Sequence, residues 1–373
     1  MRTSALLICA LMSLISPSTS AAHGFRDPGG LVYTLSNQPD DNRVLTYARN
    51  ADGALVPAGS FSTGGRGTGG GLGNQGAVIL SESGRFLFAV NPGSHDVSMF
   101  AVQRHGLRLV ERVSSGGRRP VSLTQHGGLL YVLNAGGQAG ATDNIAGFRI
   151  HPLGSLSRIA RSVRPLSAAS TSPAQISFSS GGKFLVVTEK DTNLILSFPV
   201  SHLGAAGEPI VSNSSGATPF GFAFGRRGTL FVSEAFGGAP DASALTSYEL
   251  DRSGALEVAS ASVRTTETAA CWVVLSPSGR YAYVTNTGSG TVSGYRVDED
   301  GELELLDADG ITATTGDGSS PIDAAASSRG RFVYVLASAS HSIHGFRIER
   351  DGSLTPVGVT VGLPAGANGL IAD

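Results

Sequence analysis

The chain has little charge, and neither sign dominates. It contains 27 basic and 29 acidic residues, a formal net charge of −2, and only 15% charged residues, where about 25% is usual. No run of more than two basic residues occurs, so nothing in the sequence would attract a phosphate backbone, and we expect no nucleic acid partner. A hydrophobic content of 41% with so low a net charge also argues against disorder.

Long apolar runs are absent, and the one near the start is short. The stretch Ala5–Ile15 follows Arg2 and precedes small residues at 19–22, but a membrane-spanning helix needs roughly 20 apolar residues. This order of charge, apolar stretch and small residues is typical of a secretory signal peptide. We therefore predict that residues 1–22 are a signal peptide, that residues 23–373 form a single domain, and that the protein is secreted to the periplasm or the exterior without a membrane anchor.

Cysteine is almost absent, and helical periodicity is not found. Cys9 lies in the predicted signal peptide, so Cys271 would be the one cysteine of the mature protein, and no internal disulfide can form. No stretch places apolar residues at helical spacing over three turns, which excludes α-helical solenoids.

What is abundant is glycine, with 51 residues, and short runs of β-branched and aromatic residues between the glycines. Seven such runs start at intervals of 43 to 55 residues, a period typical of propellers and solenoid arrays. The runs are Leu31–Leu35, Phe86–Val90, Leu129–Leu133, Phe184–Thr188, Thr229–Ser233, Tyr281–Thr285 and Phe332–Leu336.

Each repeat holds four predicted strands. A second run follows the first, as in Ser342–Ile348, and ends in a glycine turn such as Glu349–Gly352. A third strand leaves the turn, and a fourth begins near a proline, as in Pro173–Phe178, and enters the next repeat. Four antiparallel strands per repeat of about 50 residues make a propeller blade. The sequence predicts an all-β, seven-bladed β-propeller.

The two ends of the repeat array complement each other. The first repeat begins at Leu31 without an innermost strand, and the last is followed by a surplus strand, Ala367–Ile371. We expect this C-terminal strand to join the first blade and close the ring, because pairing the two leaves no open sheet edge.

The tetrapeptide Tyr283-Val284-Thr285-Asn286 resembles the signature of YVTN-type propeller repeats. The whole predicted domain resembles the seven-bladed lactonase family, which includes 6-phosphogluconolactonase-like and carboxymuconate cyclase-like proteins. This resemblance implies a hydrolase or cyclase that acts on a small lactone or carboxylated ring, with His, Arg and Glu residues around the channel. Glu189 resembles the acidic residue of the family, but no histidine begins an innermost strand.

The ends of the second strands supply catalytic candidates, because they lie on the rim where the innermost strands start. The column reads Ser36, Asn91, Asn134, Glu189, Glu234, Asn286 and Ala337. Buried carboxylates need partners, so Glu189 and Glu234 indicate acid/base work or a polar ligand. The alternative is that they pair with Lys190 or with backbone amides.

Residues at the same rim are the ligand-binding candidates. Arg118 and Arg119 can bind a carboxylate or phosphate; the alternative is that they are solvated loop residues. Trp272 can stack on the ring of a ligand; the alternative is that it packs in the core. The full set is Gln75, Arg118, Arg119, Gln175, Lys190, Trp272, Asp323 and Asn368.

The remaining motifs predict no metal and no cofactor. Asp298–Gly301 begins like a calcium loop but lacks the glutamate at position 12, and Gly64–Gly71 opens no helix, so we interpret it as a flexible rim loop. We expect a monomer with a small-molecule ligand, acting as a secreted lactonase-like enzyme. The alternative is a non-catalytic extracellular propeller whose rim binds a ligand, a cell-wall component or a protein. A histidine close to a channel glutamate would favour the enzyme.

Overall fold

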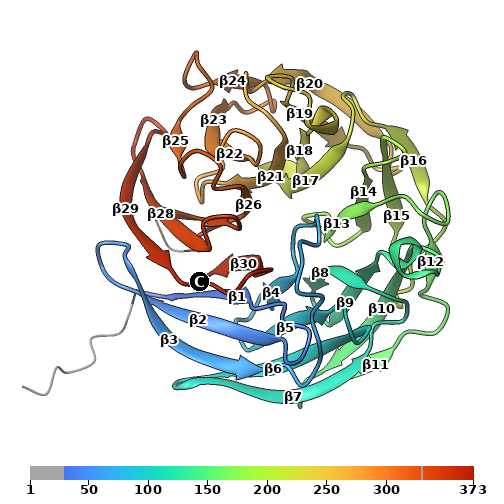
Figure 1. Cartoon of the computed structure of the whole chain (residues 1–373). Coiled ribbons are helices and arrows are strands. Elements are labelled where there is room, and N and C mark those ends of the chain that lie inside the picture. Colours follow the sequence, from blue (N-terminus) through green and yellow to red (C-terminus); the bar gives the residue numbers. More distant parts are fainter. Residues whose placement is uncertain (1–28, 329–330) are drawn as a thin grey trace, which may run out of the picture.

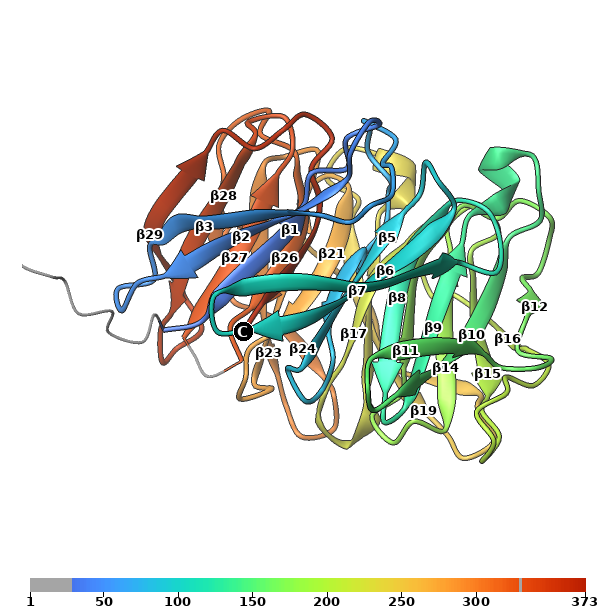
Figure 2. The same cartoon turned by 90° about the horizontal axis from the view of Figure 1, so that it is seen from below.

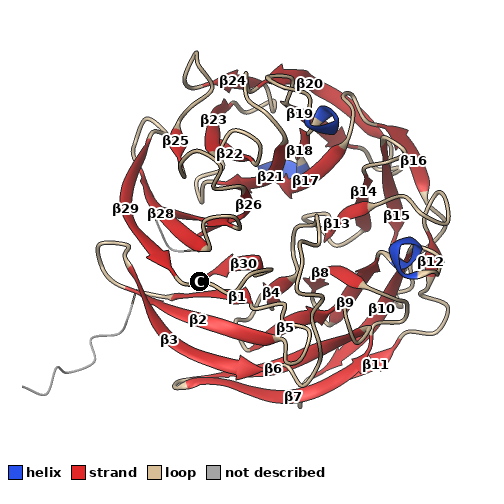
Figure 3. Cartoon of the chain, in the orientation of Figure 1, coloured by secondary structure: helices blue, strands red, loops and turns tan. Residues whose placement is uncertain are grey.

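The short β-branched and aromatic runs form strands that hydrogen-bond into seven antiparallel sheets, arranged as blades around a central axis (Figure 1). The structure is a computed structural model that describes residues 29–328 and 331–373. Within these residues, strands make up nearly all regular structure, and the exceptions are three short 3₁₀ helices (Figure 3): η1 (Gly136–Ala139), η2 (Arg226–Gly228) and η3 (Phe236–Gly238). The predicted all-β, seven-bladed propeller is confirmed. The predicted signal peptide lies outside the described residues.

Blades 1 to 6 each run along the sequence from the innermost strand to the outermost. Blade 1 has β4 (Val78–Leu80), β5 (Phe86–Asn91), β6 (Asp96–Gln103) and β7 (Gly106–Ser114). Blade 2 has β8 (Pro120–His126), β9 (Leu129–Asn134), β10 (Asn144–His151), β11 (Ser155–Arg158) and β12 (Arg164–Pro165). Blade 3 has β13 (Pro173–Phe178), β14 (Phe184–Glu189), β15 (Leu194–Pro199) and β16 (Ile210–Asn213).

Blade 4 has β17 (Pro219–Phe224), β18 (Leu230–Glu234), β19 (Ala244–Leu250) and β20 (Leu256–Arg264). Blade 5 has β21 (Ala270–Leu275), β22 (Tyr281–Asn286), β23 (Thr291–Val297), β24 (Leu303–Leu305) and β25 (Ala313–Thr314). Blade 6 has β26 (Pro321–Ala326), β27 (Phe332–Ala337), β28 (Ser342–Ile348) and β29 (Leu354–Val361).

Blade 7 joins the two ends of the repeat array. Its sheet order is β3 (Leu55–Ser62), β2 (Arg43–Arg49), β1 (Leu31–Leu35) and β30 (Asn368–Ala372). Strand β30 pairs antiparallel with β1, with Val32 opposite Ala372 and Tyr33 opposite Ile371. Figure 1 shows β30, in red, beside β1, in blue. The predicted closure of the ring by the C-terminal strand is confirmed.

Buried tyrosines connect neighbouring blades. The hydroxyls of Tyr131, Tyr283 and Tyr334, all on second strands, donate to a turn carbonyl of the following blade at 2.7 to 2.8 Å. For Tyr334 the acceptor is Gly53 O, and Gly53 has a φ of +98°. A β-carbon there would lie 2.3 Å from the Phe332 ring, so glycine is required both by the turn and by the close approach of the next blade.

The blades expose two different faces, seen edge-on in Figure 2. Because strands alternate in direction, innermost strands start and second strands end on one face, which we call the mouth face. The hairpins between first and second strands and the turns between third and fourth strands lie on the other, which we call the hairpin face.

The glycine-rich connection between β3 and β4 does not stay on the rim. Its residues Gly73–Gln75 reach across the channel, and we call them the cross-channel segment. The Gln75 amide donates to Ala174 O of blade 3 at 3.1 Å, and the Gln75 side chain donates to Val273 O of blade 5 at 2.9 Å. In Figure 1 this connection reaches the centre of the ring beside β13. The predicted rim loop, Gly64–Gly71, ends before this segment, which no sequence pattern predicted.

Candidate functional site

The two predicted catalytic glutamates are buried and hydrogen-bonded within their surroundings. Glu189 accepts from the Ser167 amide at 2.9 Å, from the Ser167 hydroxyl, and from Thr192 Oγ1 at 2.6 Å. Ser167 belongs to the connection that arrives from blade 2, and Thr192 belongs to the turn after β14. These contacts satisfy a carboxylate without a ligand.

Glu234 has equivalent partners. Its oxygens accept from the Gly216 amide at 2.8 Å, from Thr246 Oγ1 of β19 at 2.6 Å and from Ser262 Oγ of β20 at 2.7 Å. The two glutamates share no hydrogen-bond partner, and neither pairs with Lys190 in the described residues. The partnership with backbone amides that we gave as the alternative is therefore present at both.

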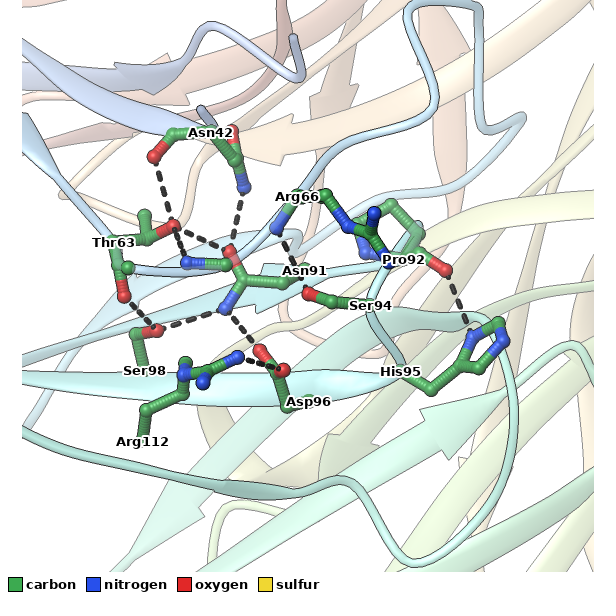
Figure 4. A network of polar contacts seen from close by, with 12 residues as sticks. Asn42, Thr63, Arg66, Asn91, Pro92, Ser94, His95, Asp96, Ser98 and Arg112 are labelled. Carbon is green, nitrogen blue, oxygen red and sulfur yellow. Dashed lines mark hydrogen bonds and ion pairs between the residues drawn. The ribbon is translucent and has the colours of Figure 1, made fainter. Parts of the chain in front are cut away.

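Asn91, at the same column of blade 1, behaves in the same way (Figure 4). Its amide donates to Asp96 Oδ1 at 2.7 Å and Ser98 Oγ at 2.8 Å of the third strand. Its oxygen accepts from Thr63 Oγ1 at 2.7 Å and Asn42 Nδ2 at 2.9 Å. Glu234 and Asn91 thus tie the end of the second strand to the third strand and to the connection from the preceding blade, and Glu189 ties it to that connection and to the turn. A catalytic role for Glu189 and Glu234 stays a prediction, which the turnover of the double variant Glu189→Gln/Glu234→Gln tests.

Lys190, one position further, is the one charged residue in its column of the mouth face. The residues after the second strands are Asn37, Pro92, Ala135, Lys190, Ala235, Thr287 and Ser338. Lys190 Nζ donates to Gly73 O at 2.5 Å and lies 4.4 Å from the centre of the Phe220 ring. The pKa of Lys190 is lowered to about 8, chiefly by burial; Cys271 and Asp191 oppose the shift, and Arg119 adds to it. An ammonium has three donors, so two remain for a ligand.

Arg119 is the second cation at the mouth. It occupies the position before the innermost strand, where five blades have a residue with a positive φ of 50° to 60°: Arg119, Ser172, Thr218, Ala269 and Ser320. Since this conformation repeats, it belongs to the fold and is no special strain at Arg119. The side chain is half-buried, its Nε has no hydrogen-bond partner, and burial lowers the pKa of its guanidinium. A buried donor without an acceptor favours an anionic ligand.

The apolar wall of the mouth is formed by Trp272, Phe220 and Cys271. The Trp272 and Phe220 rings lie 5.0 Å apart, and Trp272 Nε1 donates to Asn74 O of the cross-channel segment at 2.6 Å. Trp272 is 3% exposed. Its ring therefore packs in the core, which was the alternative to stacking on a ligand. Burial raises the pKa of the Cys271 thiol to about 12, so this cysteine is not a nucleophile at neutral pH.

The other predicted ligand-binding residues fall into two groups. Some make structural hydrogen bonds, and others have polar atoms without a partner. Gln175 both donates to and accepts from the Phe222 backbone, at 2.9 and 2.6 Å, and Gln75 makes the corresponding pair of contacts to Val273. Arg118 is exposed, with a 3.4 Å contact to Ala139 O. The two glutamines are therefore occupied by joining inner strands.

Asp323 and Asn368, on the innermost strands of blades 6 and 7, are fully buried. Asp323 Oδ2 and both amide atoms of Asn368 have no hydrogen-bond partner in the described residues. Asp323 Oδ1 accepts from the Ala324 amide at 2.8 Å. Burial raises the pKa of Asp323 well above its usual value, against hydrogen bonds from the Ala324 and Leu370 backbones. Asp323 therefore holds its proton at pH values where exposed aspartates are ionised.

Replacing Asp323 with Asn should give a stabilisation that depends on pH. Because the pKa of Asp323 is raised on folding, its contribution to stability is intact below about pH 4, near the pKa in the unfolded chain, and falls as pH rises towards the folded pKa. We expect Asp323→Asn to match the wild type near pH 3.5 and to gain in melting temperature as pH rises. Thermal denaturation from pH 3.5 to 8 checks this. A difference that is constant across that range would contradict the expectation.

The described residues contain neither a candidate metal site nor a candidate membrane-spanning helix. The described residues hold no group of three or more His, Cys, Asp and Glu side chains suited to a metal ion. No helix in the described part of the chain is long and apolar enough to cross a membrane.

Sequence reasoning missed the cross-channel segment and Phe220, and it did not separate Lys190 from the other candidates. One signal for Lys190 is available: Lys183 and Lys190 are the only lysines in the sequence, beside 25 arginines. His95 lies in the connection between β5 and β6. It contacts the mouth, since its Nδ1 lies 3.2 Å from the Arg119 amide and 3.0 Å from Pro92 O (Figure 4).

Comparisons with known proteins agree with the fold. The sequence profile described as "Lactonase, 7-bladed beta-propeller" matches residues 24–164 and 243–368, well over half of the chain. No curated protein matches by sequence. Among solved structures, the chain is similar to a periplasmic gluconolactonase of Pseudomonas aeruginosa (17% identity, TM-score 0.71, covering 91% of this chain and 98% of that one). It is also similar to a proposed 6-phosphogluconolactonase of Bacteroides fragilis (19%, 0.69, 94% and 99%). At these identities the two structures show the shared fold.

Proposed function

The chain belongs to the family of seven-bladed β-propeller lactonases, and on this premise we propose that it is a secreted, lactonase-like hydrolase acting on a small lactone or carboxylated ring at the mouth of the channel. The observation that carries the proposal is the pair Arg119 and Lys190. Both are cations at positions where the other repeats have uncharged residues, both are half-buried, and both have donors left over.

Arg119 binds the carboxylate of the ligand in this proposal. Its Nε is buried and unpartnered, and a guanidinium matches a carboxylate with two parallel hydrogen bonds. Phe220, whose ring lies 4.4 Å from Lys190 Nζ, offers apolar surface for the ring of the ligand.

Lys190 transfers the proton. With a pKa of about 8, a substantial fraction of Lys190 is neutral at pH 8 and can accept a proton from water. The water oxygen then bonds to the lactone carbonyl carbon, the ring C–O bond breaks, and Lys190 returns the proton to the leaving alkoxide. Glu189 acts as a positioning residue, because its hydrogen bonds to Ser167 and Thr192 fix the turn that carries Lys190.

Lys190→Met should lower turnover about 10²- to 10⁴-fold, the range for loss of a general base. In the wild type, kcat/KM should rise with pH through about 8, the pKa of Lys190. A panel of lactones with and without a carboxylate, assayed against purified protein, checks both statements. The matched control is Lys183→Met, since Lys183 is the other lysine and is exposed on the hairpin before β14. Undiminished turnover in Lys190→Met would refute this mechanism.

A second function is supported by a specific observation. Glu189 and Glu234 are satisfied inside their blades, and no histidine hydrogen-bonds to either in the described residues, which suits a non-catalytic propeller that binds a carboxylated ligand. In that case calorimetry with the lactone panel should show saturable binding without turnover, and Arg119→Met should remove the binding. Turnover by the wild type would exclude this alternative.

Secretion and the monomeric state belong to the same proposal. Secretion is supported by the order of charge, apolar stretch and small residues in 1–22. Mass spectrometry of protein collected outside the cytoplasm, together with light scattering, should show a single chain that has lost about 20 residues. A full-length chain retained inside the cell would contradict secretion.

A further inference from the structure

Three grooves in the described part of the hairpin face lie at equivalent positions of the repeat. Each lies between the inner hairpin of one blade and the outer turn of the following blade. They are found between blades 1 and 2, about 480 Å³, between blades 4 and 5, about 400 Å³, and between blades 5 and 6, about 390 Å³. Since the architecture is shared, differences between the grooves come from their side chains.

The grooves differ in charge. The groove between blades 5 and 6 is lined by four arginines and one glutamate: Arg280, Arg331, Arg347, Arg350 and Glu349. Its formal charge is therefore +3. The groove between blades 1 and 2 has one ionised group of each sign, Arg85 and Glu82, with His151 neutral. The groove between blades 4 and 5 has three arginines facing Asp298 and Glu299.

One of the four arginines is neutralised. Arg347 Nε lies 2.8 Å from Glu349 Oε1. Hydrogen bonds from Thr355 and Arg347 lower the pKa of Glu349, which keeps its carboxylate ionised. Arg280, Arg331 and Arg350 have no carboxylate within 4.0 Å in the described chain. Three guanidinium groups therefore remain for a ligand.

The floor of this groove is rigid. The Arg280 guanidinium lies over the Tyr281 ring, 5.7 Å from its centre, and the Tyr281 hydroxyl donates to Arg350 O at 2.9 Å. In the same turn, the carbonyl oxygen of Gly352 accepts from the buried Tyr283 hydroxyl at 2.8 Å. The backbone that presents Arg350 is thus fixed from below, which reduces the ordering cost of binding.

We propose that the groove between blades 5 and 6 binds a small ligand that carries two or more linked phosphate groups. Guanidinium forks match phosphate oxygens, three unpaired arginines match a charge of about −3, and the volume lies in the range of small-molecule sites. The groove is on the hairpin face, so this site is separate from the one proposed at the channel mouth and does not depend on it.

Calorimetry with inorganic pyrophosphate and tripolyphosphate at low salt tests the proposal. The wild type should bind one equivalent, and the double variant Arg280→Gln/Arg350→Gln should bind at least tenfold more weakly. Both side chains are exposed, so the fold should persist, which circular dichroism checks. Arg85→Gln, in the neutral groove, is the matched control. Arg280 also lines the groove between blades 4 and 5. Arg226→Gln, which changes that groove alone, tests whether the ligand binds there instead.

Three results would overturn the site. The first is no saturable binding at low salt. The second is an affinity unchanged in the double variant. The third is an equal loss in Arg85→Gln or Arg226→Gln, because a loss that is independent of position indicates diffuse attraction by surface charge.

Discussion

Deletion of residues 365–373 should open the ring and cause the protein to aggregate. The deletion removes β30, which is the only partner of the inner edge of β1. It also removes Leu370 and Ala372 from the apolar cluster that contains Val32 and Tyr334. Exposed strand edges pair with other chains, so we expect a large loss of soluble protein and a melting temperature lower by more than 10 °C, on the order of several kcal/mol.

The matched control keeps the strand and changes its connection. The Asp373 amide donates to Leu31 O at 2.9 Å, so the end of β30 lies beside the start of β1. A permuted chain in which residues 365–373 precede residue 29 through a short turn should therefore fold and remain soluble. Light scattering and thermal denaturation compare the two variants. Full solubility and an unchanged melting temperature in the deletion would show that closure does not stabilise the ring.

Glu234→Ala should be among the most destabilising single substitutions in the chain. It leaves the buried Gly216 amide without an acceptor and removes the partner of Thr246 and Ser262. A buried unsatisfied donor costs about 1–3 kcal/mol, and the lost contacts to the hydroxyls add to that, so we expect a loss of about 2–4 kcal/mol. The midpoint of urea denaturation measures it.

Glu234→Gln is the conservative control. The Gln oxygen can still accept from Gly216, and the Gln amide can donate to hydroxyls that rotate to accept. We expect this variant to remain within about 1 kcal/mol of the wild type. If Glu234→Ala is as stable as the wild type, the carboxylate does not stabilise the blade. Its burial then requires another explanation, such as a ligand.

The repeats made the fold predictable, because each local signal agreed with the others. Apolar runs at regular spacing, glycine turns and an unpaired strand at each end admit one arrangement, a ring closed by β30. The residues at the mouth could be listed for the same reason, since strand direction alone decides which ends share a face.

The orientation of side chains at the mouth was not predictable. Glu189 and Lys190 are neighbours, and in a strand a shift of one residue reverses the side that a side chain faces. The partners of Glu189 come from Ser167, in a connection without a periodic pattern, and from Thr192. Gln75 lies 198 residues from its partner Val273, and no local signal in a glycine-rich stretch reports a contact of that range.

The pairing of β1 with β30 also sets a schedule for biosynthesis. Thr34 and its hydrogen-bond partner Asn368 are 334 residues apart. At about 5–20 residues per second, β1 leaves the ribosome on the order of tens of seconds before its partner. During that interval six blades can form in order along the nascent chain, while the edge of β1 stays open to wrong partners. Completion of the ring must therefore wait for β30, the last described strand to be synthesised, and until then the open edge of β1 is the part of the chain that a holding chaperone has most to protect.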